Sequence, residues 1–135
     1  MNTSINESTW DTQKTKRLAK ITAATDKGLE KIVPNDRVVE LLETVIARED
    51  RVCIEGNNQK QADFLSESLS QCNPDILNNL HILQSVLALP SHIDIFEKGI
   101  ASKVDFSFAG PQALRLAKLV QKQQIHIGSI HTYLE

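Results

Sequence analysis

The residues best suited to chemistry form a short polar turn that follows an apolar run in the sequence. Residues 52–54 are apolar and largely β-branched, which predicts a short strand buried on both faces. The turn after this strand contains Glu55, Gly56, Asn57, Asn58, Gln59 and Lys60. Glycine and asparagine adopt left-handed backbone conformations at low cost, so amide N–H groups at the start of the next helix can point outward. Such amides could hold an anion or a developing oxyanion, and an ordinary strand-to-helix turn is the alternative.

Three side chains, one in this turn and two outside it, could meet a ligand directly. Glu55 ends the predicted strand, where a carboxylate could act as a base, as a nucleophile or as a hydrogen-bond acceptor. The alternative for Glu55 is a residue that only stabilises the turn. Gln112 and His131 are weaker candidates, because they are selected only by their position after predicted strands.

Metal ligands and activated nucleophiles have no recognisable pattern in this chain. The four histidines show no HxH, HxxxH or HExxH spacing, and no serine lies in a GxSxG motif. Cys53 and Cys72 form no CxxC pair, so we expect each to be a small buried hydrophobic residue. The sequence therefore predicts no metal site.

Alternating helices and strands must position the polar turn. Apolar periodicity predicts helices near residues 35–48, 62–72, 91–100 and 111–120, and strands at 52–54, 80–87, 104–108 and 125–130. Ser91 and Asp94 resemble a capping box at a helix start, and Leu114, Ala117 and Val120 are expected on the inner face of the last helix. This order predicts an α/β fold of βαβ units, with a mainly parallel open sheet and flanking helices.

Composition and charge limit the classes of function. The chain has 135 residues and a net charge of −2, which fits one domain and gives no indication of a nucleic-acid or membrane partner. Residues 1–30 are polar and are expected to form a loosely held arm, with the α/β domain at 31–135. No apolar run reaches the roughly 18 residues of a membrane span, and no leader is visible, so we expect a cytoplasmic protein.

Four blocks of sequence closely resemble one family, the malonate decarboxylase alpha subunits, which are the acyl-carrier-protein transferases of that complex. The blocks are EGNNQKQADFL at 55–65, QSVLALP at 84–90, FSFAGPQA at 106–113 and IHTYLE at 130–135. The resemblance implies a CoA-transferase-like fold, of which this chain would be an incomplete amino-terminal half that stops without a terminating helix. It also implies that Glu55 to Lys60 form the family's first strand-to-helix loop, part of the acyl-binding wall.

The activity implied by this resemblance is the exchange of acetyl for malonyl on a carrier thiol: acetyl-carrier and malonate give malonyl-carrier and acetate. The thiol would belong to a phosphoribosyl-dephospho-CoA group on a separate acyl carrier protein, and decarboxylase subunits would be further partners. Lys60 could pair with a malonate carboxylate or a carrier phosphate, or remain a solvated surface charge. The nucleophilic glutamate of such transferases is expected outside this chain, which alone should be inactive.

Two other functions remain open on the sequence. The chain could be a non-catalytic assembly module that docks other subunits of the complex. It could also be a small domain that binds phosphate esters, because a polar turn before a helix is a general anion site.

Overall fold

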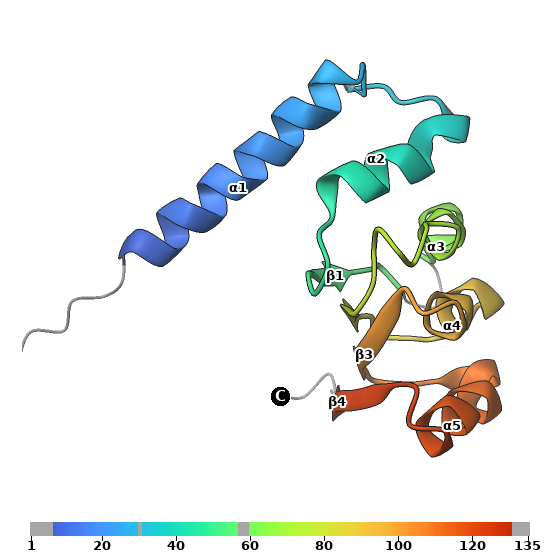
Figure 1. Ribbon diagram of the computed structural model, residues 1–135. Coiled ribbons are helices and arrows are strands. Elements are labelled where there is room, and N and C mark those ends of the chain that lie inside the picture. The colour runs from blue at the N-terminus through green and yellow to red at the C-terminus, as the bar shows by residue number, and fades with distance from the viewer. Residues whose placement is uncertain (1–6, 30, 57–59, 131–135) are drawn as a thin grey trace, which may run out of the picture. The chain divides into compact units, whose positions relative to one another are not determined.

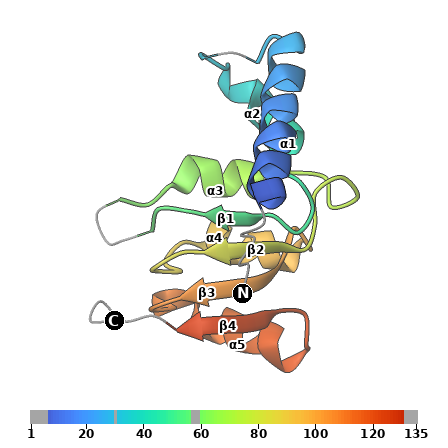
Figure 2. The ribbon, with the colours of Figure 1, turned by 90° about the vertical axis from the view of Figure 1, so that its left-hand side faces the viewer.

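The computed structural model describes residues 7–29, 31–56 and 60–130, and its C-terminal part contains a parallel sheet (Figure 1). The strands are β1 (Arg51–Cys53), β2 (Leu80–Leu83), β3 (Ala101–Phe106) and β4 (His126–Ile130). They lie in the order β1-β2-β3-β4, and each neighbouring pair is parallel (Figure 2). The predicted α/β fold with a mainly parallel open sheet is confirmed.

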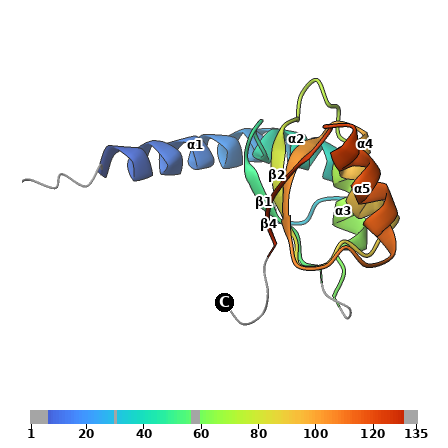
Figure 3. The same cartoon turned by 90° about the horizontal axis from the view of Figure 1, so that it is seen from below.

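Three helices connect the strands and cover one face of the sheet. They are α3 (Asp63–Ser70), α4 (Pro90–Glu97) and α5 (Ala113–Gln121), the last preceded by the 3-10 turn η2 (Gly110–Gln112). Each right-handed crossover adds its strand on the same side of the one before, so all three helices lie on the same face (Figure 3). The core between sheet and helices contains Leu80, Ile82, Leu87, Ile93, Ile95, Ile100 and Val104, all fully buried.

None of the helices α3, α4 and α5 covers the opposite face of the sheet (Figure 3). Arg51 and Cys53 of β1 are exposed on this face, and only Val52 between them is half-buried. The predictions of a strand buried on both faces and of a buried Cys53 are therefore wrong. Cys72 is buried, as expected.

A polar cluster on this open face links three strands. His81 of β2 lies beside Asp105 of β3, with 2.9 Å between Nε2 and Oδ2. The backbone N–H of Ser129 in β4 donates to Asp105 Oδ1 at 2.8 Å. The carboxylate is almost enclosed, with 13% of its side chain exposed. Asp105 thus joins β2 and β4 through β3.

The start of α4 differs from the predicted capping box. The helix begins at Pro90, and the N–H of Leu89 donates to Nδ1 of His92 at 3.3 Å. Asp94 lies on the other side of the helix, where its carboxylate pairs with Arg115 at 2.7 Å. His92 therefore takes the role expected of Asp94, and no side chain at the N-cap takes the role expected of Ser91.

The inner face of α5 also differs from the prediction. Leu116 and Leu119 are buried, whereas Leu114 is 79% exposed and Val120 is 38% exposed. Burial of these two leucines orients the helix. The orientation also brings the guanidinium of Arg115 to two carboxylates of α4, Asp94 and Glu97, at 2.7 Å each.

The chain divides into two compact units, residues 1–45 and 46–135. In the first unit, residues that were expected to form a loose arm form the helix α1 (Glu7–Asp26). The next elements along the chain are the 3-10 turn η1 (Asn35–Arg37) and the helix α2 (Val38–Val45), and α1 packs against α2. A Schellman motif ends α1: Gly28 N–H donates to Thr25 O at 2.8 Å, and Leu29 N–H donates to Ala24 O at 2.9 Å. Gly28 has the left-handed φ of 70° that this motif requires.

A non-glycine residue occupies the equivalent left-handed position after α5. Gln123 has φ 56°, and Gln124 N–H donates to Leu119 O at 3.0 Å. Because a side chain at this φ is strained, Gln123→Gly should raise the free energy of unfolding by about 0.5–1 kcal/mol. Urea unfolding followed by circular dichroism measures the change. Gln124→Gly, one residue outside the strained position, is the control, and an equal gain there would contradict this explanation.

Candidate functional site

Three strand-end loops are tied together at the carboxyl edge of the sheet. The carbonyl oxygen of Gly56, in the loop after β1, accepts hydrogen bonds from Val86 N–H at 2.9 Å and from Ser85 Oγ at 2.8 Å. Ser85 O in turn accepts from Ser107 N–H and Phe108 N–H, both at 3.0 Å. These bonds join the loops after β1, β2 and β3 into one continuous surface.

Gly56 lies in this surface because of a close approach and not because of its backbone conformation. It is not among the residues with positive φ, contrary to the expectation of a left-handed turn at this position. A Cβ atom there would lie 2.6 Å from Gln84 Nε2, 2.7 Å from Gln84 Cγ and 3.0 Å from Val86 O. Only glycine fits without displacing Gln84.

Glu55 and Lys60 lie on the outside of the loop. Both side chains are largely exposed, and the distance between Lys60 Nζ and Glu55 Oε1 is 3.9 Å. The backbone carbonyl of Glu55 accepts from Ala62 N–H at 3.2 Å, and Gly56 pairs with Gln61 as an isolated antiparallel bridge. The described backbone contacts of Glu55 and Gly56 therefore close the turn.

The other predicted site residues fall into two groups. Asn57, Asn58, Gln59 and His131 lie outside the described residues. Gln112 is described, and its amide nitrogen donates to Ala88 O at 3.2 Å. Its Oε1 is 3.5 Å from Arg115 Nη1. Gln112, in the loop after β3, is therefore connected to the loop after β2 through its amide nitrogen and to α5 through its amide oxygen.

Two buried polar residues beside Gly56 were not predicted. Gln84 is 4% exposed and His92 is fully buried, and the amide nitrogen of Gln84 lies 3.0 Å from His92 Nε2. Burial lowers the pKa of the His92 imidazole, so the ring is neutral at pH 7. The signal in the sequence was a glutamine inside the stretch 80–87, which was predicted as one strand, whereas β2 ends at Leu83.

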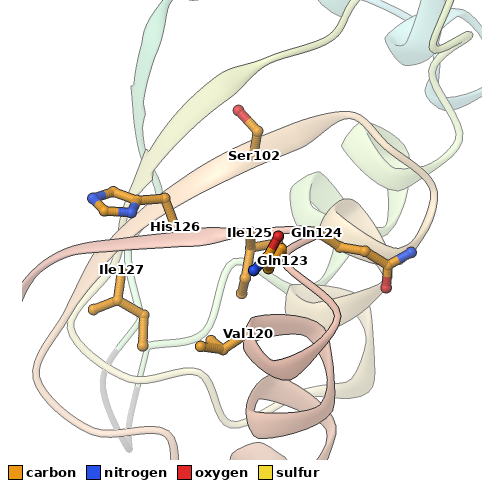
Figure 4. Close-up of a pocket in the computed structure, with 7 residues that line it drawn as sticks. All are labelled: Ser102, Val120, Gln123, Gln124, Ile125, His126 and Ile127. Carbon is orange, nitrogen blue, oxygen red and sulfur yellow. The ribbon is translucent and has the colours of Figure 1, made fainter.

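The described residues contain no group of three or more metal-ligating side chains. None of their helices is long and apolar enough to cross a bilayer. A hollow of about 620 Å³ does occur, between the end of α5 and the start of β4, lined by Val120, Gln123, Ile125, His126 and their neighbours (Figure 4). It lies at the amino end of the strands, opposite the strand-end loops, and forms no part of the candidate site.

Comparisons with known proteins agree on one family. The family described as malonate decarboxylase, alpha subunit, transporter matches residues 9–135. A curated relative from Malonomonas rubra, acetyl-S-ACP:malonate ACP transferase, is 47% identical over 130 residues, which are 96% of this chain and 24% of the relative.

Two solved structures have the same fold. The crystal structure of a malonate decarboxylase alpha subunit from Acinetobacter baumannii has 46% identity and a TM-score of 0.88. A Pseudomonas malonate decarboxylase hetero-tetramer in complex with malonate has 43% identity and a TM-score of 0.86. Each comparison covers 93% of this chain and 23% of the solved chain. The chain thus spans about a quarter of the length of the proteins it matches.

Proposed function

Because this chain belongs to the malonate decarboxylase alpha-subunit family, we propose that it forms the first acyl-binding loops of an acyl-carrier-protein transferase. The reaction exchanges acyl groups on a carrier thiol: acetyl-carrier and malonate give malonyl-carrier and acetate. The thiol belongs to a phosphoribosyl-dephospho-CoA group that stays on a separate carrier protein. Decarboxylase subunits of the complex are the other partners.

One observation supports this proposal above the others. Three of the four sequence blocks that resemble the family, at 55–65, 84–90 and 106–113, contain the loops that meet at the carboxyl edge of the sheet. In open parallel sheets, this is the edge where ligands bind. An assembly module would have no need for the three blocks to meet at this edge.

The chemistry assigned to this chain is binding and not nucleophilic attack. Glu55 is exposed beside Lys60, without the shielding from water that would make its carboxylate a stronger nucleophile. The nucleophile is therefore proposed to come from another part of the transferase. The loop 55–60 contributes hydrogen-bond donors to the acyl group.

A chimera tests the transfer function directly. In the Malonomonas rubra relative, this chain would replace the matching segment of 130 residues. Transfer from acetylated carrier protein to malonate is then followed by mass spectrometry of the carrier. Transfer by the chimera supports the proposal. A folded chimera without transfer contradicts it, and transfer by this chain alone would place the nucleophile within these 135 residues.

Substitution of the loop asparagines gives a residue-level prediction. In the chimera, Asn57→Ala with Asn58→Ala should lower kcat/KM for malonate about tenfold, the effect of one lost hydrogen bond to a charged group. The matched control is Asn78→Ala, because Asn78 bonds to Pro74 O in the connection that leads into β2. Equal losses in both variants would show that the loop asparagines have no particular role.

A further inference from the structure

We propose that Gln84 and His92 form a buried pair that positions the first strand-end loop through Gly56, a role that rests on the transferase function proposed above. Gln84 follows β2 directly, and His92 lies in the first turn of α4. The Gln84 amide nitrogen is 3.1 Å from His92 Nδ1 and 3.0 Å from His92 Nε2. Both residues are positioning residues, because they act on the loop through Gly56.

The ring of His92 is held in one tautomer. Leu89 N–H donates to Nδ1 at 3.3 Å, so Nδ1 is an acceptor and the single proton of the neutral ring lies on Nε2. The bond from Leu89 also fixes the ring within the start of α4. With the proton on Nε2, the amide nitrogen of Gln84 can donate only to Nδ1, which lies 3.1 Å away, and the uncharged ring of His92 is its partner.

Gln84 contacts the backbone of the first loop from one side. Its amide and Cγ occupy the space that a side chain at Gly56 would need, with closest distances of 2.6 and 2.7 Å to an added Cβ. The next two residues hold Gly56 from another side, since Ser85 Oγ and Val86 N–H both donate to its carbonyl. Residues 84–86 thus set the point from which the loop leaves the sheet.

Amide hydrogen exchange in this chain tests the positioning without any transfer assay. In Gln84→Met or His92→Leu, exchange of Val86 N–H, which bonds to Gly56 O, should speed up about tenfold. Exchange of Leu80 N–H, which bonds to Ile100 O at the other end of β2, should not change. Gln124→Met, an exposed glutamine exchanged for the same residue, is the control.

Two exchange results would overturn the proposal. Equal acceleration at Val86 and Leu80 would mean general destabilisation of the sheet, and no acceleration at Val86 would mean that Gly56 is held without Gln84. Gln84→Met leaves the bond between Leu89 and His92 intact, so it decides the question if His92→Leu does not fold.

Transfer kinetics in the chimera test whether the positioning serves the reaction. Each substitution should lower kcat/KM per folded molecule about tenfold, and the double variant should lose no more than either single one, because both act on the same contact. Additive losses, or exchange effects without loss of transfer, would overturn the proposal. A wild-type chimera without transfer would instead refute the proposed function, while the exchange experiment still decides the positioning.

Discussion

Gly56→Ala is expected to lower acyl transfer by the chimera about 10²-fold. The added methyl group would lie 2.6 Å from Gln84 Nε2 and 3.0 Å from Val86 O, so the loop must shift outward. A shift of about 1 Å in a substrate-positioning element can cost this much in rate. Overpacking should also lower the free energy of unfolding by about 1–3 kcal/mol, measured by urea denaturation of the chain.

A second substitution tests whether the contact between the added methyl group and Gln84 causes the lost stability. Gln84→Ala removes both of the closest contacts to the new Cβ, so it should restore most of the stability lost in Gly56→Ala. Transfer should not recover, because the pair that positions the loop is then missing. The contact with Gln84 is not the cause of the lost stability if the two effects are additive. In that case Gln84→Ala would destabilise the Gly56→Ala variant as much as it destabilises the wild-type chain.

Asp105→Ala should lower the free energy of unfolding of the chain by about 1–3 kcal/mol. The substitution leaves Ser129 N–H and the imidazole of His81, which is 8% exposed, without their carboxylate partner. Urea unfolding at pH 7 measures the loss. Asp11→Ala removes the same charge from an exposed site on α1 and should change stability by less than about 0.5 kcal/mol.

The contribution of Asp105 should also depend on pH in a defined direction. Burial raises the pKa of its carboxyl group. The hydrogen bond from Ser129 and the charges of His81 and Lys103 together lower the pKa by more than burial raises it, so the net pKa is below the usual value. A carboxyl group whose pKa is lower in the folded state stabilises the fold fully above its unfolded pKa, about 3.9. That contribution is lost as the pH falls through the lower folded value.

The stability difference between the wild-type chain and Asp105→Ala should therefore shrink as the pH falls below about pH 4. Taking the difference removes the titrating groups that do not interact with Asp105. A difference that stays constant down to pH 2, or that grows in acid, would show that the carboxylate is not held by these partners.

Local patterns in the sequence were sufficient for the type of fold. Short apolar runs separated by amphipathic stretches predicted four strands, and all four are present in a parallel sheet. The order of these elements was enough because βαβ connections have one strongly favoured handedness. The polar turn at 55–60 was also located correctly at the end of a strand.

The sequence analysis was wrong for two helices whose apolar residues do not form a single stripe. Residues 7–26 are helical although their apolar side chains, such as Trp10, Leu18 and Ile21, are exposed. Helix-forming lysine, arginine and alanine residues and the Schellman motif at Gly28 stabilise α1 without an apolar stripe. In α5, leucines lie on two faces, and contacts with the rest of the fold bury Leu116 and Leu119 and leave Leu114 exposed.

The sequence by itself determined the parallel α/β architecture, the place of the first loop and, through its four blocks, the family. Only the tertiary structure decided which residues surround that loop. Gln84 and His92 are separated from Gly56 by 28 and 36 residues in the sequence, and they reach it because parallel pairing sets the ends of β1 and β2 side by side. Periodicity describes the faces of single elements, whereas the close approach at Gly56 depends on the register between two strands.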